Sequence, residues 1–175
     1  MQQYNFLLIV VAFVRISMAE NTVVSAKIVE ISYEDLLSGK DLTASIAEAY
    51  GFDGIGLLTV SGVPGLLEAR GNLLPLARRF ATMDESVQSK YEDENSFYSF
   101  GWSLGKEKLE GKPDNSKGSY YANPQYDKPV DDEEIIKKYP GFASPNIWPT
   151  EEIPEFEAFF KALGQLIVCG GKLVA

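Results

Sequence analysis

The stretch from Tyr50 to Glu68, YGFDGIGLLTVSGVPGLLE, constrains the fold of this chain more than any other. Glycines flank its apolar run at 57–60 on both sides, which is typical of a short buried strand. Gly62-Val63-Pro64 then ends the strand. Pro64 suits the first turn of a helix, because its fixed φ is already helical and the N–H that it lacks has no partner there. The stretch therefore predicts that a helix, a short strand and a second helix meet here.

The patterns on either side extend this to a mixed α/β domain. Strands are expected at 27–31 and 57–60, and helices at 42–50, 64–81, 83–91, 131–138 and 152–169. Asp41 or Thr43 can cap the first of these helices, and Asp131 or Asp132 can cap the fourth. Thr82-Met-Asp-Glu85 has the spacing of a capping box, so we expect it to start the helix at 83–91. Apolar residues recur every three or four positions in 64–81 and 152–169, so each of these helices is expected to present one apolar stripe.

The segment 92–128 lacks regular periodicity and is unusually rich in aromatic residues. We expect a long irregular loop that is packed rather than disordered. One interpretation is a wall or lid of a substrate pocket. In this interpretation the shape of the pocket comes from Tyr98, Trp102 and Tyr120, and its polar group comes from Lys106 or Asn123. The other interpretation is that the aromatic side chains close the core, and it is favoured because buried aromatic residues most often serve packing.

Composition and charge narrow the class of protein. The length of 175 residues suits one domain, with 45% hydrophobic residues to form a core. The formal charge of −9 repels phosphate backbones, so nucleic acid is not expected as a partner. Cys169 is the single cysteine, which rules out a disulfide within the chain, and no Asn-x-Ser/Thr sequence is present. These features favour a reducing compartment, and we expect a cytoplasmic protein.

The first nineteen residues leave an alternative open. The apolar run at 6–14 is too short to span a bilayer but long enough for the core of a secretory signal, and Ser17-Met18-Ala19 offers a cleavage site. Arg15 lies where such a signal stays neutral. Residues 1–19 are therefore either a signal-like segment of a secreted protein or a misassigned leader ahead of a start at Met18. No stable membrane span is expected.

Four motifs, in this order and spacing, resemble one known family. They are YGFDGIGLLTVSGVPGLLE, Tyr98-Ser-Phe-Gly-Trp102, Gly118-Ser-Tyr-Tyr-Ala-Asn-Pro124 and Asn146-Ile-Trp-Pro149. From about residue 26 onward the chain resembles the N-terminal region of the isopenicillin N synthase-like 2-oxoglutarate- and Fe(II)-dependent dioxygenases. In that family the region precedes the catalytic jelly roll, a double-stranded β-helix. The resemblance implies that residues 26–175 are this N-terminal domain, truncated in its last helix and without the jelly roll. It also implies Fe(II), 2-oxoglutarate and a small-molecule substrate for a full-length member.

The chain departs from the family in its chemistry. Family members hold iron with two histidines and one carboxylate, which suit Fe(II) and leave positions open for the co-substrate and oxygen. This sequence contains no histidine. We therefore expect no catalytic, cofactor-binding or metal-binding residues here, and no activity from this chain alone. Two hypotheses remain: the N-terminal portion of an oxidoreductase, or a non-catalytic binding or decoy module derived from the family.

The last expectation concerns self-association. The helix at 152–169 carries an apolar stripe made of Phe156, Phe159, Phe160, Leu163 and Ile167. Without a jelly roll to cover it, part of this stripe is expected to face solvent. Because exposed apolar surface of this kind promotes association, we expect the chain to self-associate through residues 152–174.

Overall fold

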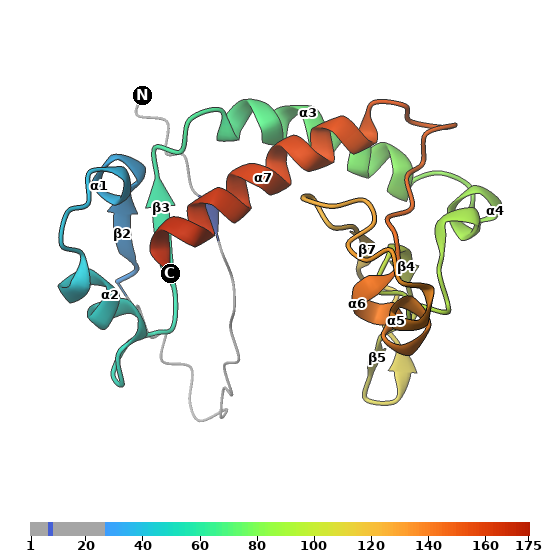
Figure 1. The fold of residues 1–175 in the computed structure, drawn as a ribbon, viewed down its shortest axis with the longest axis horizontal. Helices are drawn as coiled ribbons and strands as arrows, with labels where there is room; N and C mark the ends of the chain where they lie inside the picture. Colours follow the sequence, from blue (N-terminus) through green and yellow to red (C-terminus); the bar gives the residue numbers. More distant parts are fainter. Residues whose placement is uncertain (1–6, 9–26) are drawn as a thin grey trace. The chain divides into compact units, whose positions relative to one another are not determined.

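A computed structural model describes residues 7–8 and 27–175, and these form a mixed α/β structure (Figure 1). The chain divides into two compact units. Unit 1 contains residues up to Leu67 together with residues 166–175, and unit 2 contains residues 68–165. Apart from residues 7–8, the expectation for residues 1–19 lies outside the described residues.

A small sheet forms the centre of unit 1. It consists of β1 (Leu7–Leu8), β2 (Val29–Ser32) and β3 (Leu58–Ser61), in the order β1-β3-β2. β2 runs parallel to β3 with Ile31 opposite Val60, and both of these side chains are buried. The strands expected at 27–31 and 57–60 are thus confirmed, with small shifts in their ends. A parallel pair needs a crossover connection, and the helices between β2 and β3 supply it.

Two helices make up this crossover (Figure 1). The short helix α1 (Tyr33–Leu37) was not expected from the sequence; the Ser32 hydroxyl starts it by accepting the Asp35 N–H at 3.0 Å. The second helix, α2 (Thr43–Tyr50), confirms the expected helix at 42–50. The Asp41 carboxylate accepts the N–H of Thr43, the first α2 residue, at 3.0 Å, although Asp41 lies one residue before the cap position at Leu42.

The long helix α3 (Leu66–Ala81) starts later than expected. Pro64 does not lie in its first turn, so that expectation was wrong. The reason is Gly65, whose φ of +74° is left-handed and interrupts the chain between Pro64 and the helix. The apolar stripe is confirmed at Leu66 and Phe80, which are 2% and 1% exposed.

The expected capping box is also wrong. The Thr82 hydroxyl donates to the carbonyls of Arg78 and Arg79, both at 3.1 Å, so it closes the end of α3 rather than starting the next helix. The helix expected at 83–91 is present as a single short turn, α4 (Glu85–Gln88), followed by the 3-10 helix η1 (Ser89–Tyr91).

The expectation of an irregular loop at 92–128 needs the largest correction. This segment contains four short strands: β4 (Gly101–Leu104), β5 (Lys108–Leu109), β6 (Lys112–Pro113) and β7 (Gly118–Tyr121). β4 pairs antiparallel with β7, with Trp102 opposite Tyr120, and β5 pairs with β6 in a hairpin between them. Strands of two to four residues that begin with glycine or lysine carry too few alternating positions to be recognised from sequence.

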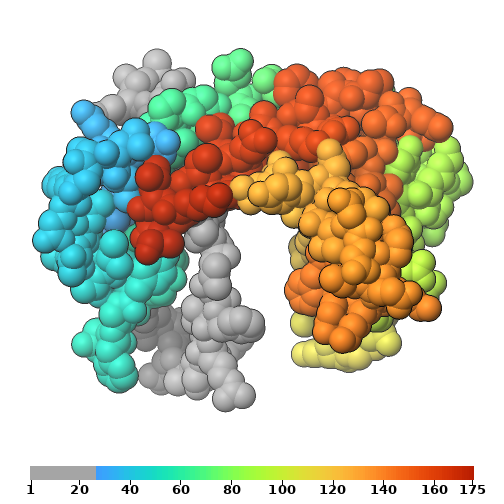
Figure 2. Space-filling model, in the orientation of Figure 1, coloured from blue at the N-terminus to red at the C-terminus, as the bar shows by residue number. Residues whose placement is uncertain are grey.

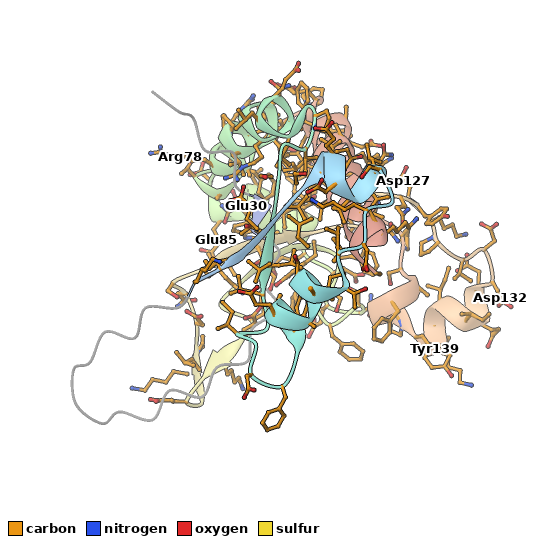
Figure 3. The ribbon with its side chains drawn as sticks, turned by 90° about the vertical axis from the view of Figure 1, so that its left-hand side faces the viewer. Glu30, Arg78, Glu85, Asp127, Asp132 and Tyr139 are labelled. Atoms are coloured by element: carbon orange, nitrogen blue, oxygen red, sulfur yellow. The ribbon has the colours of Figure 1, made fainter. Side chains whose placement is uncertain are left out.

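The remaining helices are α5 (Glu133–Lys138), α6 (Pro140–Ala143) and α7 (Phe156–Val174). α5 confirms the helix at 131–138: Asp132 accepts the N–H of the second helical residue at 2.9 Å, and Asp132 and Tyr139 mark its two ends (Figure 3). α7 confirms the helix at 152–169, although it starts later and continues further.

Aromatic rings form the core of unit 2, with Phe80 at their centre. Four rings surround Phe80 at centroid distances of 5.1–6.4 Å, and they belong to Tyr91, Trp102, Tyr120 and Phe156. Phe156 is 1% exposed because it packs against this cluster, whereas Ile167 of the same stripe is 38% exposed, so part of the stripe faces solvent as expected. Self-association through 152–174 stays a prediction that can no longer rely on Phe156.

Candidate functional site

The residues around the β5–β6 hairpin form a pocket of about 310 Å³ at the surface of unit 2. Seven residues from a single stretch of the chain line it: Phe97, Tyr98, Ser99, Ser103, Lys106, Glu107 and Tyr121. The turn of the hairpin, near residue 110, lies at the molecular surface (yellow in Figure 2). The lining combines three aromatic rings with one ammonium and one carboxylate group.

An unusual backbone conformation shapes one wall of the pocket. Phe97 and Tyr98 both have left-handed φ angles, 57° and 59°. Such angles cost roughly 1–3 kcal/mol per non-glycine residue and persist only where the surroundings hold them. Here the fully buried Ser96 holds the turn: its hydroxyl donates to the Asp93 carbonyl at 3.0 Å and accepts the Phe100 N–H at 3.3 Å. The turn leaves the Phe97 ring 76% exposed.

Lys106 supplies the positive charge of the pocket and is already paired. Its Nζ lies 2.7 Å from the Glu92 carboxylate and 4.7 Å from the centroid of the Tyr98 ring. The hydrogen bond to Glu92 raises the pKa of Lys106 above its ordinary value. The lysine therefore stays charged, with both a counter-ion and an aromatic face beside it.

Glu107 supplies the negative charge and is held more loosely. Its carboxylate accepts the Tyr121 hydroxyl at 3.2 Å and pairs with Lys117 at 3.3 Å. The lysine and glutamate side chains of this pair are 56% and 55% exposed. The hydrogen bond to Glu107 raises the pKa of Lys117. Exposed pairs of this kind contribute little stability.

The five substrate-facing candidates lie in different parts of unit 2. Tyr98 and Lys106 line the pocket. Trp102 and Tyr120 do not; they belong to the aromatic core, as the packing interpretation predicted. Trp102 lies so close to Gly118 that a Cβ there would come within 2.3 Å of its ring. Tyr120 donates its hydroxyl to the Ile147 carbonyl at 2.7 Å, and burial raises its pKa.

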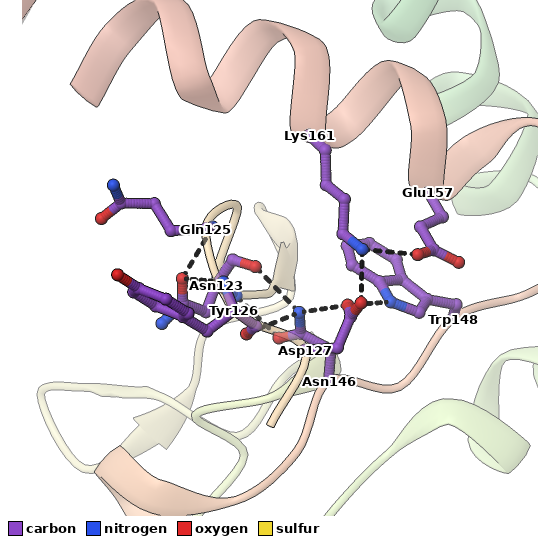
Figure 4. A network of polar contacts seen from close by, with 8 residues as sticks. All are labelled: Asn123, Gln125, Tyr126, Asp127, Asn146, Trp148, Glu157 and Lys161. Carbon is purple, nitrogen blue, oxygen red and sulfur yellow. Dashed lines mark hydrogen bonds and ion pairs between the residues drawn. The ribbon is translucent and has the colours of Figure 1, made fainter. Parts of the chain in front are cut away.

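Asn123 belongs to a hydrogen-bonded network rather than to the pocket (Figure 4). Its side-chain oxygen accepts the N–H groups of Gln125 and Tyr126 at 2.9 and 3.1 Å. Its own N–H donates to the Asn146 side-chain oxygen at 2.7 Å, and the Asn146 amide donates back to the Asn123 carbonyl at 2.8 Å. Asn123 therefore fixes a turn and does not line this pocket.

Asp127 is the centre of this network, which we call the Asp127 network. Its carboxylate accepts the Trp148 Nε1–H at 2.9 Å and an Asn146 amide N–H at 3.1 Å, and it pairs with Lys161 of α7. Lys161 also contacts Glu157 at 2.6 Å. The hydrogen bond from Lys161 is the main reason that the pKa of Asp127 lies below its ordinary value.

The Asp127 network explains the Asn146-Ile-Trp-Pro149 motif physically. Asn146 and Trp148 bind Asp127, and the intervening Ile147 carbonyl binds Tyr120. Pro149 is fully buried and accepts the Ile153 N–H at 2.7 Å, just before α7. The sequence motif was visible, but its partner Asp127 is nearly twenty residues away and carried no signal of its own.

A second polar cluster holds Glu152, in the segment before α7, to η1 and to the end of α3. The Tyr91 hydroxyl donates to the Glu152 carboxylate, Lys90 pairs with the same carboxylate at 3.3 Å, and Arg79 donates to the Glu152 carbonyl at 2.8 Å. Burial, followed by the bond to Glu152, raises the pKa of Tyr91 to about 12. No sequence pattern predicted this cluster.

Two features are absent from the described part of the chain. Within residues 7–8 and 27–175, no three His, Cys, Asp or Glu side chains are grouped so that they could hold a metal ion. In the same ranges, no helix combines the length and apolar character needed to cross a membrane.

Comparisons with known proteins do not place the chain in a family. No protein-family model, curated protein or solved structure matches it.

Proposed function

We propose that these residues are the N-terminal, substrate-contacting part of an isopenicillin N synthase-like oxygenase that uses Fe(II) and 2-oxoglutarate. In this proposal the chain supplies a wall of the substrate pocket and does not supply the iron centre. The reaction type and the substrate depend on the active site of the whole enzyme, because one fold can carry many different sites.

The observation that carries the proposal is the position of Tyr98 and Lys106. Both were candidates from the aromatic segment at 92–128, and both line the pocket around the β5–β6 hairpin. The order of elements supports it as well: the helix α2, the strand β3, the glycine-valine-proline turn and the long helix α3 follow one another, as in the pattern of the resemblance.

The residues of this chain do not fit the iron site that the family uses. The sequence contains no histidine, and the described ranges hold no trio of ligating side chains. Fe(II) and 2-oxoglutarate would therefore have to be bound by residues outside these 175. No step of the reaction is assigned to the present residues.

Sequencing the transcript beyond the codon for Ala175 tests the proposal. We expect a continuing reading frame that encodes a His-x-Asp motif and a distant second histidine, because these three side chains form the iron triad. A stop codon without them would contradict the proposal and favour the alternative, a non-catalytic binding or decoy module. Titration of the purified chain with Fe(II) and 2-oxoglutarate in a calorimeter is the companion measurement. A stoichiometric, micromolar Fe(II) site in this chain would contradict its assigned role.

A further inference from the structure

We propose that the pocket binds a small organic ammonium ion, which pairs with the Glu107 carboxylate in place of Lys117. The role of that ammonium ion as part of a substrate rests on the proposed function. Its binding to the pocket does not, and can be measured on this chain alone.

The lining favours a cation because three aromatic rings, those of Phe97, Tyr98 and Tyr121, border the pocket. The faces of such rings attract ammonium groups, and cages of aromatic residues recognise amines in this way. The pocket already contains one example, since the Lys106 ammonium lies 4.7 Å from the centroid of the Tyr98 ring.

Two lysine–carboxylate ion pairs each include one residue of the pocket lining: Lys106 in the first and Glu107 in the second. Glu92 and Tyr98 hold Lys106, with a close ion pair of 2.7 Å and a lysine side chain that is 30% exposed. Glu107, which accepts the Tyr121 hydroxyl, pairs with Lys117 at a longer 3.3 Å, and this lysine side chain is 56% exposed and does not line the pocket. Lys117 thus competes with a ligand for the Glu107 carboxylate. Because an exposed ion pair contributes little free energy, an incoming ammonium ion can replace it.

An anionic ligand fits the same pocket less well. The one ammonium group that lines it, on Lys106, is already neutralised by Glu92. The net charge of −9 on the chain attracts cations over long range and repels anions. The volume of about 310 Å³ lies at the lower end of the range for ligand pockets, about 300–1,000 Å³, which fits a small molecule.

Titration of the ¹⁵N-labelled chain with phenethylamine, followed by NMR, tests the proposal. The neutral analogue 2-phenylethanol and the anionic analogue phenylacetate are titrated in parallel. We expect phenethylamine to bind most tightly and to shift the amide signals of residues around the pocket, including Ser103, Glu107 and Tyr121. Signals of the Asp127 network should not move.

Two variants and one control identify the site. Glu107→Gln should weaken phenethylamine binding by about 3- to 5-fold, because it removes the ion pair of an exposed carboxylate. Lys117→Met should tighten binding by about 2- to 5-fold, because it removes the internal competitor for an exposed ion pair. The matched control is Lys108→Met, on the same hairpin but outside the pocket lining, and it should leave the affinity unchanged. Melting curves of all three variants check that each one folds.

Three outcomes would overturn the proposal. The first is binding of none of the three compounds to the folded chain. The second is tighter binding of phenylacetate, lost in Lys106→Met, which would identify an anion site. The third is a weaker rather than tighter complex with folded Lys117→Met. None of them affects the transcript test, so failure of the ammonium site and failure of the proposed function are distinguishable.

Discussion

Unit 2 uses the same chemistry in two contrasting ways, in the Asp127 network and in the pocket. Lys161 lies between two carboxylates, on Asp127 and Glu157, and its side chain is 25% exposed. Lys117 has one carboxylate partner, Glu107, at 3.3 Å and is 56% exposed. The first lysine joins segments far apart in the sequence, whereas the second joins positions of a single hairpin.

The difference shows why residue type alone does not reveal a binding site. A tyrosine, a lysine and an acid near one another can hold elements together or remain accessible to a ligand. What decides is the number of partners per polar group and the packing behind them. Three residues, Trp148, Asn146 and Lys161, bind the Asp127 carboxylate, and Lys161 also binds Glu157. The Glu107 carboxylate binds two residues, Lys117 and Tyr121, from the same stretch of chain.

The largest difference in the free energy of unfolding is expected between a variant of the aromatic core and a variant of the pocket rim. Phe80→Ala should lower the free energy of unfolding by about 3–5 kcal/mol, because it removes the ring around which four others pack. Phe97→Ala at the pocket rim should change it by less than about 0.5 kcal/mol, because that ring is exposed. Urea unfolding of the two variants measures both. Equal losses would contradict the division between a packed core and an accessible pocket.

A substitution in the Asp127 network should give the next largest decrease in the free energy of unfolding. Asn146→Ala should lower the free energy of unfolding by about 1–3 kcal/mol, because it leaves the Asn123 N–H and carbonyl without their partner. Asn95→Ala, at an exposed asparagine near the pocket, is the matched control and should be nearly neutral. A small loss for Asn146→Ala, measured by the same urea curves, would show that water replaces the network at no cost.

Much of unit 1 could be predicted from the sequence, because its elements carry strong local signals. The glycine-bounded run at 57–60 and the Asp41 cap led to a strand and a helix that the structure contains. The errors arose where tertiary contacts decide between local options. The Thr82 hydroxyl could cap the following helix or bind the carbonyls at the end of α3, and in the structure it binds those carbonyls.

The candidate site could be predicted only in part, for a related reason. Aromatic residues in 92–128 were recognised, but burial depends on which side of a four-residue strand each one occupies. Trp102 faces the core because Gly118 leaves room for its ring. Phe97 and Glu107 were not singled out at all, since a left-handed turn and a loose ion pair leave no recognisable pattern in the sequence.

Tyr91 provides a pH-dependent test of the cluster at the start of α7. Its pKa in the folded chain, about 12, lies above the ordinary value of 10.0. The stabilising contribution of the neutral phenol is therefore complete below pH 10 and is lost as the pH rises through 12. Over this window the free energy of unfolding should fall more for the wild type than for Tyr91→Phe. Tyr126→Phe, at an exposed tyrosine, is the control and should behave like the wild type.

The smallest difference in the free energy of unfolding is expected between variants of the two lysines, Lys161 and Lys117. Lys161→Met should lower the free energy of unfolding by about 1 kcal/mol, because it leaves two neighbouring carboxylates without their shared partner. Lys117→Met should change it by no more than a few tenths of a kcal/mol, as is usual for an exposed pair. Thermal and urea unfolding in low salt measure the difference. A larger loss at Lys117 would assign the hairpin ion pair a structural role.

Hydrogen–deuterium exchange with and without phenethylamine tests the contrast between a supporting network and a binding pocket most directly. Amides at 123–127 and 146–161 should exchange slowly and should not respond to the ligand, because packing and several hydrogen bonds hold them. Amides at 105–121 should exchange faster in the free chain and slow down when phenethylamine binds. Equal protection of both regions, with no response at 105–121, would contradict the account.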